Sequence, residues 1–456
     1  MLSCEHIRLL GTKSGDTVLR RFLSARQGNV PIMTAALFVP MALMAGGAID
    51  LVEQERLRVA LQNALDRGVL AAASLNQTQD PAPLVKSFLA EAPYASTAKV
   101  TVTEEKKTNY RKVSATAEFN YDTVFMRLAN INALPVKATA TAQESRQNIE
   151  LSMVLDISGS MLDNGGMTQL KPAAKNFLAT VLRDDSKDFT SVNFIPFAGG
   201  VNIGDKVFDY LGGASYQRRH TKSSCFEMLS ADFASGTPSW PSRDQFPHFT
   251  YYNYNVAGKQ PWWCPTSSAS VAYMSNDLKD LQARVDSLLP FDGTGTAYGM
   301  KWAELLLNPS MKPTFKAIAD KGLANSIPRA FSDRPASFTD GATLKFIVLM
   351  TDGQIGFQPR PVDPATNEVT NKNIQKEART LFDASVASAF YDKVCSYAKA
   401  EGIAIFTIAF KVDDPTAKNI AKCATDASYA YKVDGLNMGQ AFQSIATTLQ
   451  KIRITQ

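Results

Sequence analysis

Histidine is scarce in this chain of 456 residues, which contains only three. None of them stands in the H-E-x-x-H or H-x-H spacing that zinc hydrolases use, so the sequence argues against that class. The G-x-S-x-G and Walker A motifs are also missing, and the spacing of Gly293, Gly295 and Gly299 does not match a dinucleotide-binding loop. We therefore expect a protein that is not an enzyme.

An excess of charge of one sign is missing as well. The chain has 48 Lys and Arg against 43 Asp and Glu, and its net charge of +5 is small for this length. It contains no long run of Lys or Arg, which argues against nucleic acid as a partner. A length of 456 residues leaves room for two or three domains, and a hydrophobic content of 45% is ample for a sizeable core.

One stretch does carry a chemical pattern. The apolar run Leu151–Leu155 has the length of a buried strand, and it is followed by Asp156, Ser158 and Ser160 on alternate residues. One carboxylate and two hydroxyls in this order suit a hard cation such as Mg²⁺ or Mn²⁺. A serine-rich turn that merely closes the strand explains the triplet equally well.

Two later stretches favour the metal site. The sequence DGTGTAYGM at Asp292–Met300 places Thr294 in a loop before a helix, and the apolar run LKFIVLMTDG at Leu344–Gly353 ends in Asp352. Together, D-x-S-x-S, G-T-x-T and a strand ending in T-D-G resemble the pattern of von Willebrand factor A domains. The resemblance implies a metal-ion-dependent adhesion site that holds Mg²⁺, Mn²⁺ or Ca²⁺. Its ligands would be Asp156, Ser158, Ser160, Thr294 and Asp352.

The same resemblance implies a fold and a way of binding. We expect an α/β fold, a doubly wound and mainly parallel sheet with large insertions, whose sites lie at the carboxyl ends of the strands. A protein partner would offer an Asp or Glu that replaces a water on the cation. An ion that only holds the loops together remains an alternative. Ser158 and Ser160 have no sequence cue for a general base, which argues against nucleophilic catalysis.

The N-terminal region predicts a membrane anchor. Residues 1–29 are basic, and the run Val30–Ile49 carries no charge over a length that crosses a bilayer core of ~30 Å. The positive-inside rule then places the N-terminus in the cytoplasm and the rest of the chain outside. A signal peptide cleaved near Met44–Ala48 is one alternative, and a buried core helix is another.

The apolar run continues into an amphipathic pattern. Apolar or small residues recur at helical spacing at Leu57, Leu61, Ala64, Leu65, Gly68 and Ala72. A basic Gly-containing segment, a Pro-interrupted apolar helix and an Ala-rich helix resemble TadE/TadG-like proteins of the Flp (tight adherence) pilus-assembly system. Pseudopilins of that system are cut after a Gly with Glu five positions later. Here Met33 stands at that distance from Gly28, so we expect an intact anchor.

These patterns predict a domain organisation. We expect a cytoplasmic segment at 1–29, a transmembrane helix at 30–52, an amphipathic helix with a small α+β pilin-like module at 53–147, and the von Willebrand domain at 148–456 with insertions at about 199–275 and 312–341. In the module, a helix is expected at 84–89 and strands at 99–103, 112–119 and 136–142. In the C-terminal domain, a long helix is expected at 373–400 and a strand at 403–410.

The first insertion is rich in aromatic residues, including Trp240, Trp262 and Trp263. Rings outside the core could form a surface for a partner. We favour the alternative, in which they pack on one another as a separate small core, because an insertion of this size must bury something to stay ordered.

Four of the five cysteines follow the predicted anchor, and an even number in an exported domain suggests disulfides. Of the three connectivities, we expect Cys225–Cys264 and Cys395–Cys423, with buried free thiols as the alternative. The sequence thus predicts a single-pass protein of the inner membrane whose C-terminal domain is periplasmic or extracellular and acts in Flp-type pilus assembly or envelope attachment. The alternative is a surface adhesin that binds host or matrix ligands directly.

Overall fold

The computed structural model describes residues 30–90, 95–107, 110–163, 165–234, 236–435 and 437–455. The chain divides after Glu144 into two compact units. The basic segment predicted at 1–29 lies outside the described residues, and the domain limits proposed from the sequence stay predictions.

The first unit is built on one long helix, α2 (Val30–Ala72), of 43 residues. It confirms the expectation that the apolar run and the amphipathic pattern form a single helix, with Pro40 inside it. Its first half exposes large apolar side chains, whereas the predicted apolar positions of its second half, from Leu57 to Ala72, are buried. The helix is long and apolar enough to cross a membrane.

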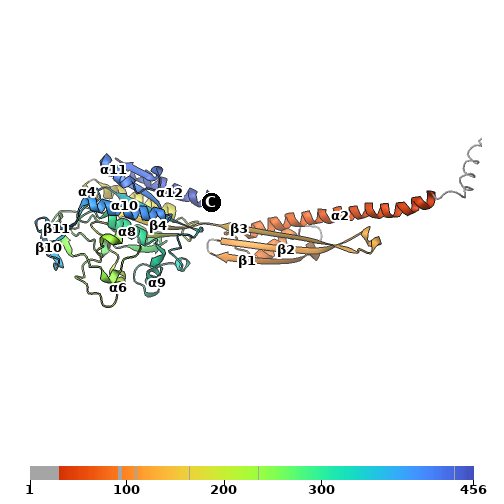
Figure 1. The fold of residues 1–456 in the computed structure, drawn as a ribbon, viewed down its shortest axis with the longest axis horizontal. Helices are drawn as coiled ribbons and strands as arrows, with labels where there is room; N and C mark the ends of the chain where they lie inside the picture. The colour runs from red at the N-terminus through yellow and green to blue at the C-terminus, as the bar shows by residue number, and fades with distance from the viewer. Residues whose placement is uncertain are drawn as a thin grey trace, which may run out of the picture. The chain divides into compact units, whose positions relative to one another are not determined.

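A short helix and a three-stranded sheet pack on the second half of α2 (Figure 1). They are α3 (Pro81–Leu89), β1 (Lys99–Lys107), β2 (Tyr110–Asp122) and β3 (Ala133–Ser145), with a 3₁₀ turn at Ala95–Thr97 and another, η2 (Met126–Ala129), between β2 and β3. Strand β2 alternates buried and more exposed residues along its length, as its sequence pattern predicts. The α+β module is therefore confirmed.

The second unit contains a six-stranded sheet with the order β13-β12-β8-β4-β5-β7. Its strands are β4 (Asn148–Asp156), β5 (Thr190–Phe197), β7 (Ala272–Ser275), β8 (Thr343–Thr351), β12 (Ala404–Phe410) and β13 (Ala430–Val433). Neighbouring strands run parallel except at the edge, where β7 pairs antiparallel with β5. The predicted fold class, a mainly parallel α/β sheet, is confirmed.

Side chains of successive strand residues point to opposite faces, and each face carries its own core. Met153 and Leu155 of β4 pack with α5 (Gly166–Val181), α7 (Leu278–Ser287) and α12 (Met438–Thr455). Val154 packs on the other face with α8 (Thr296–Leu305), α10 (Ala384–Ala400) and α11 (Asp414–Ala421). Because helices cover both faces, the central strands β4, β5, β8 and β12 are buried along almost their whole length, and their sequences are predominantly apolar, whereas the edge strand β13 is more exposed.

The remaining elements are short, and those between residues 199 and 275 or between 312 and 341 belong to the insertions. They are α4 (Ser160–Asp163), α6 (Asp205–Gly212), β6 (His248–Thr250), α9 (Lys312–Lys321), β9 (Gln358–Pro361), β10 (Glu368–Asn373) and β11 (Ala378–Phe382), with 3₁₀ turns at Ser230–Phe233, Trp240–Ser242, Ser267–Ala269, Pro309–Met311, Arg329–Phe331, Gln375–Glu377 and Ala427–Tyr429.

The first insertion differs from its prediction in two respects. It ends earlier, because residues 272–275 form the edge strand β7 of the main sheet. Its rings also do not build a separate core: Trp240 stacks on Trp302 of α8 with ring centroids 4.8 Å apart, and Trp263 lies in the same buried cluster as Val154. The insertion therefore enlarges the core on one face of the sheet.

The helix predicted at 373–400 is wrong in its first third. Residues up to Asn373 form β10, which pairs with β6, and Ala378–Phe382 form β11, which pairs with β9. Helix α10 begins only after Asp383, whose carboxylate caps it by accepting a hydrogen bond from the Val386 amide at 2.8 Å. Both predicted disulfides, Cys225–Cys264 and Cys395–Cys423, are present.

Candidate functional site

Two neighbouring strands bring the predicted site residues together. Strands β4 and β8 run parallel and pair Leu155 with Met350, so that Asp156 and Asp352 follow at the same edge of the sheet. The Ser160 hydroxyl donates to Asp352 Oδ1 at 2.7 Å, and the Ser158 hydroxyl lies 3.4 Å from the same oxygen. The two serine hydroxyls are 3.0 Å apart. Four of the five predicted residues thus form one cluster of oxygen atoms.

Asp156 is fixed by two donors from its surroundings. Its carboxylate accepts the Ser158 amide at 2.7 Å and a short hydrogen bond from the Thr351 hydroxyl. Thr351 was not among the predicted site residues, although it stands next to Asp352 in the T-D-G motif. Its role is to orient Asp156 across the two strands.

The fifth residue, Thr294, approaches from the loop before α8. This loop lies tightly against the end of β5, since the Gly295 amide donates to the Ala198 carbonyl at 2.6 Å. A Cβ atom on Gly295 would lie 2.3 Å from the Gly199 carbonyl oxygen, so only glycine fits there. A Cβ atom on Gly353 would lie 3.5 Å from the Thr294 hydroxyl. Thr294 therefore stands beside the turn that carries Asp352.

The charges of this cluster suit a cation. Burial, and then the neighbouring Asp352 carboxylate, raise the pKa of Asp156 to about 7. Two carboxylates with hydroxyl oxygens around them are ligands that Mg²⁺, Mn²⁺ and Ca²⁺ prefer, and a bound cation would favour both carboxylates in their ionised form. The described residues contain no cluster of three or more His, Cys, Asp or Glu side chains able to hold a metal. Binding here would therefore depend on the hydroxyls.

The aromatic insertion also reaches this cluster, which the sequence did not indicate. The buried Asp292 carboxylate accepts the amides of Tyr251 and Tyr252 at 2.7 Å each, and thereby holds the following Asn253. A Cβ atom on Gly159 would lie 2.9 Å from the Asn253 side-chain nitrogen and 3.4 Å from the Lys259 ammonium. The insertion thus places an amide and a cation against the loop between Ser158 and Ser160.

Lys259 is held there by an ion pair. Its ammonium lies 2.5 Å from an oxygen of Asp163 at the end of α4, and its side chain is only 11% exposed. This contact connects the insertion to α4, the short helix that begins at the predicted ligand Ser160. The positive charge of Lys259 partly offsets the two site carboxylates.

Comparison with known families bears on the N-terminal region. Residues 28–75 match the family described as putative Flp pilus-assembly TadE/G-like. The chain carries a TadE/G-like segment. This match confirms the resemblance predicted from the sequence of α2. No curated protein is significantly similar to the chain.

Solved structures similar to the chain include von Willebrand-type and pilus proteins. The pilus adhesin SpaC of Lactobacillus rhamnosus GG is 12% identical with a TM-score of 0.37, over 78% of this chain and 35% of its own. The vWF domain of the type V pili tip protein Mfa5 of Porphyromonas gingivalis is 13% identical with a TM-score of 0.39, over 68% and 98%. A von Willebrand factor type A structure from Catenulispora acidiphila is 10% identical with a TM-score of 0.30, over 76% and 49%. The chain thus spans about a third of the length of SpaC.

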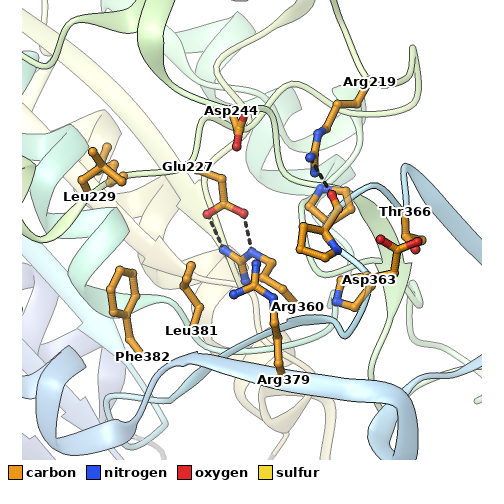
Figure 2. Close-up of a pocket in the computed structure, with 14 residues that line it drawn as sticks. Arg219, Glu227, Leu229, Asp244, Arg360, Asp363, Thr366, Arg379, Leu381 and Phe382 are labelled. Atoms are coloured by element: carbon orange, nitrogen blue, oxygen red, sulfur yellow. Dashed lines mark hydrogen bonds and ion pairs between the residues drawn. The ribbon is translucent and has the colours of Figure 1, made fainter.

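Outside the TadE/G-like segment, a cavity of about 140 Å³ lies between the first insertion and strands β9 and β11 (Figure 2). Its floor is the ion pair of Glu227 with the buried Arg360. Arg360 Nη2 donates to Glu227 Oε2 at 2.7 Å. Arg219 at its rim donates to the Pro364 carbonyl at 2.7 Å. None of its lining residues belongs to the predicted metal site, so this cavity is a separate feature.

Proposed function

We propose that this protein is a membrane-anchored, metal-dependent protein-binding component of a Flp/Tad-type pilus or of a related envelope attachment. One observation carries the proposal: Asp156, Ser158, Ser160 and Asp352 converge at the carboxyl edge of a mainly parallel α/β sheet in a chain that also carries a TadE/G-like segment. The helix supplies the attachment and the sheet edge supplies the binding site.

The anchor part of the proposal rests on α2. Its first half exposes apolar side chains such as Leu37, Phe38 and Val39 to the surroundings, which an aqueous environment disfavours. A stretch of this length in a bilayer would bury these side chains in lipid and satisfy every backbone group within the helix. We place this helix in the inner membrane, with the C-terminal unit on its outer side.

The binding part rests on how the chain arranges its own oxygen atoms. The Thr351 hydroxyl and the Ser158 amide orient Asp156, and the Ser160 hydroxyl orients Asp352. A bound Mg²⁺, Mn²⁺ or Ca²⁺ would offer a coordination position to a carboxylate oxygen of a partner protein. The two site carboxylates neutralise that cation, and the hydroxyls of Ser158, Ser160 and Thr294 complete its protein ligands.

Calorimetric titration of the full chain in detergent with Mg²⁺ and with Mn²⁺ tests this proposal. We expect binding at one site that is lost in Asp156→Ala. Asp320→Ala is the matched control, because Asp320 is an exposed carboxylate of α9 paired with Lys316 at 2.7 Å. Equal heats in wild type and Asp156→Ala would contradict the assignment of the site.

Affinity capture separates a binding ion from one that only holds the loops together. Envelope proteins retained by the immobilised chain in Mg²⁺ should be released by EDTA and should not be retained by Asp156→Ala. If neither EDTA nor the Asp156→Ala substitution changes this retention, while calorimetry still shows that the wild-type chain binds the metal ion, the ion has a structural role.

A further inference from the structure

The connection between β2 and β3, residues 123–132, exposes an unusual number of apolar side chains. Leu128 is 78% exposed, Val124 65%, Ile131 42% and Phe125 38%. Four large apolar residues within eight positions form a patch that a loop in water would not be expected to carry. We call these residues the hairpin tip.

The hairpin tip is a defined structure. The Thr123 amide donates to the Asn132 carbonyl at 3.0 Å and closes the loop, and the Ile131 amide donates to the Met126 carbonyl at the same distance. Between them lies the 3₁₀ turn η2, which ends at Asn130 in the left-handed conformation with φ of 66°. The apolar side chains are therefore held outward by a closed network of backbone hydrogen bonds.

A single carboxylate attaches the hairpin tip to α2. Asp50 is buried and accepts the amides of Val124, Phe125 and Met126 at 3.0, 2.8 and 2.6 Å. The phenol of Tyr121 lies 3.3 Å from the same carboxylate. Three converging amides around one side chain fix the height of the tip along the helix.

The position of the hairpin tip along α2 coincides with the end of the apolar run. Asp50 follows directly after Val30–Ile49, and the tip also packs on Gly46, where a Cβ atom would lie only 2.6 Å from the Phe125 ring. At ~1.5 Å rise per residue, Gly46 lies only about 5 Å before the last residue of the run. Charged residues, absent from the run, recur from Asp50 onward, and Glu53 pairs with Arg56. The tip thus stands where a bilayer core would give way to headgroups.

From this juxtaposition we propose that the hairpin tip is a second membrane contact, which inserts Val124, Phe125, Leu128 and Ile131 into the outer interface of the bilayer beside α2. Its occupant is lipid, because α2 exposes large apolar side chains at the same level of the helix, among them Ile49 and Leu51. Exposed Arg127 in the same turn suits headgroup phosphates. The consequence is that α2 and the module approach the membrane as one body. The inference rests on the proposed anchor.

Depth-dependent fluorescence quenching of the full chain in liposomes tests it. In a Cys4→Ser background, single cysteines labelled with an environment-sensitive dye are placed at Leu128, Ile49, Leu37 and Lys106. All four are exposed, so the substitutions leave the core intact. Lys106 is the control, because it lies in β1 opposite Arg111, at the other end of β2 from the tip. Lipids with a quencher near the headgroup or deep in the acyl chain report depth.

We expect the shallow quencher to act on Leu128 as strongly as on Ile49, with a blue-shifted emission at both positions. The deep quencher should act on Leu37, and neither should act on Lys106. Quenching at Leu37 and Ile49 without quenching at Leu128 would overturn the second contact and leave the anchor standing. No quenching at Leu37 would instead refute the anchor, and with it the inference.

Discussion

Several charges in the C-terminal unit are buried, and each depends on a specific partner. The clearest case is Arg360, which is 3% exposed, bonds to Glu227 through two nitrogens and stacks on Phe246 at 4.0 Å. Removing one charge of a buried ion pair costs little stability only when the remaining partner can be hydrated. Glu227 lines the cavity of Figure 2, but its side chain is only 14% exposed and therefore has little access to bulk water.

We therefore predict that Arg360→Met lowers the free energy of unfolding by about 3–5 kcal/mol, because it leaves the Glu227 carboxylate unpaired. Denaturant unfolding followed by tryptophan fluorescence measures this. Lys316→Met removes an exposed ion pair and should leave the free energy of unfolding nearly unchanged. Similar losses for both variants would mean that Glu227 is hydrated and that the cavity floor is not closed.

Lys259 permits a prediction about the proposed metal site itself. Its ammonium stands against the loop between Ser158 and Ser160 and repels any cation that binds there. Lys259→Met keeps the length of the side chain and removes the charge, so we expect Mg²⁺ to bind several-fold more tightly by calorimetry. Lys316→Met is again the control and should leave the affinity unchanged. Weaker binding in Lys259→Met would show instead that Lys259 supports the ligand loop.

At the scale of elements, the first disulfide secures the insertion that reaches the site. Cys225 and Cys264 are 39 residues apart, and Cys395 and Cys423 are 28 apart. Loop-closure entropy gives each bond about 4 kcal/mol on the chain-entropy model. The two bonds differ in what they enclose, because only the first loop contains Asn253 and Lys259.

Replacing either cysteine pair by alanine should accordingly lower the unfolding free energy by similar amounts, about 3–4 kcal/mol. Only Cys225→Ala/Cys264→Ala should also open the insertion to limited proteolysis within residues 225–264 and change Mg²⁺ affinity. Mass spectrometry of the fragments locates the cleavage. Identical fragment patterns for both double variants would mean that the insertion is held by its aromatic packing alone.

The elements also show which features could be predicted from the sequence. Strands β4, β8 and β12 are buried on both faces, so each appears as a continuous apolar run, and Asp156 and Asp352 follow directly from their ends. The short strands β10 and β11 carry exposed polar residues and depend on partners far along the chain, as when β10 pairs with β6. The helix predicted at 373–400 covered β11, where the local pattern favoured a helix, and only Asn373 of β10.

The residues of the candidate site also divide into those that a local motif reveals and those that only tertiary contacts reveal. Its five proposed ligands stand in contiguous motifs and could be named from the sequence. Thr351, Asp292 and Lys259 act through contacts that exist only after folding, since the Lys259 ion pair with Asp163 spans 96 residues. Tertiary contacts of this separation leave no local signal in a single sequence.

At the scale of the whole molecule, the apolar half of α2 either stays in the membrane as an anchor or is removed as a cleaved signal peptide. A chain that starts at Asp50 keeps the carboxylate that holds the hairpin tip and the whole apolar core of the α+β module, whose first residue is Leu57, and loses only the contact of the tip with Gly46 and Gly47. We predict that this shortened chain folds but moves from the membrane pellet to the soluble fraction after alkaline extraction, whereas the full chain stays in the pellet. Intact mass of the full chain tests the cleaved-signal alternative, which requires loss of the first ~45 residues.

The side of the envelope on which the C-terminal unit works separates assembly from direct adhesion. An assembly component needs only the periplasm, whereas an adhesin must be exposed outside the cell. If the protein acts in assembly, protease added to intact cells should leave residues 145–456 uncut, and the same protease should degrade them once the outer barrier is opened. Degradation in intact cells would favour the adhesin. In both cases the metal site at Asp156 would be the same, since the position of the anchor, and not the chemistry of the sheet edge, determines which partners can reach it.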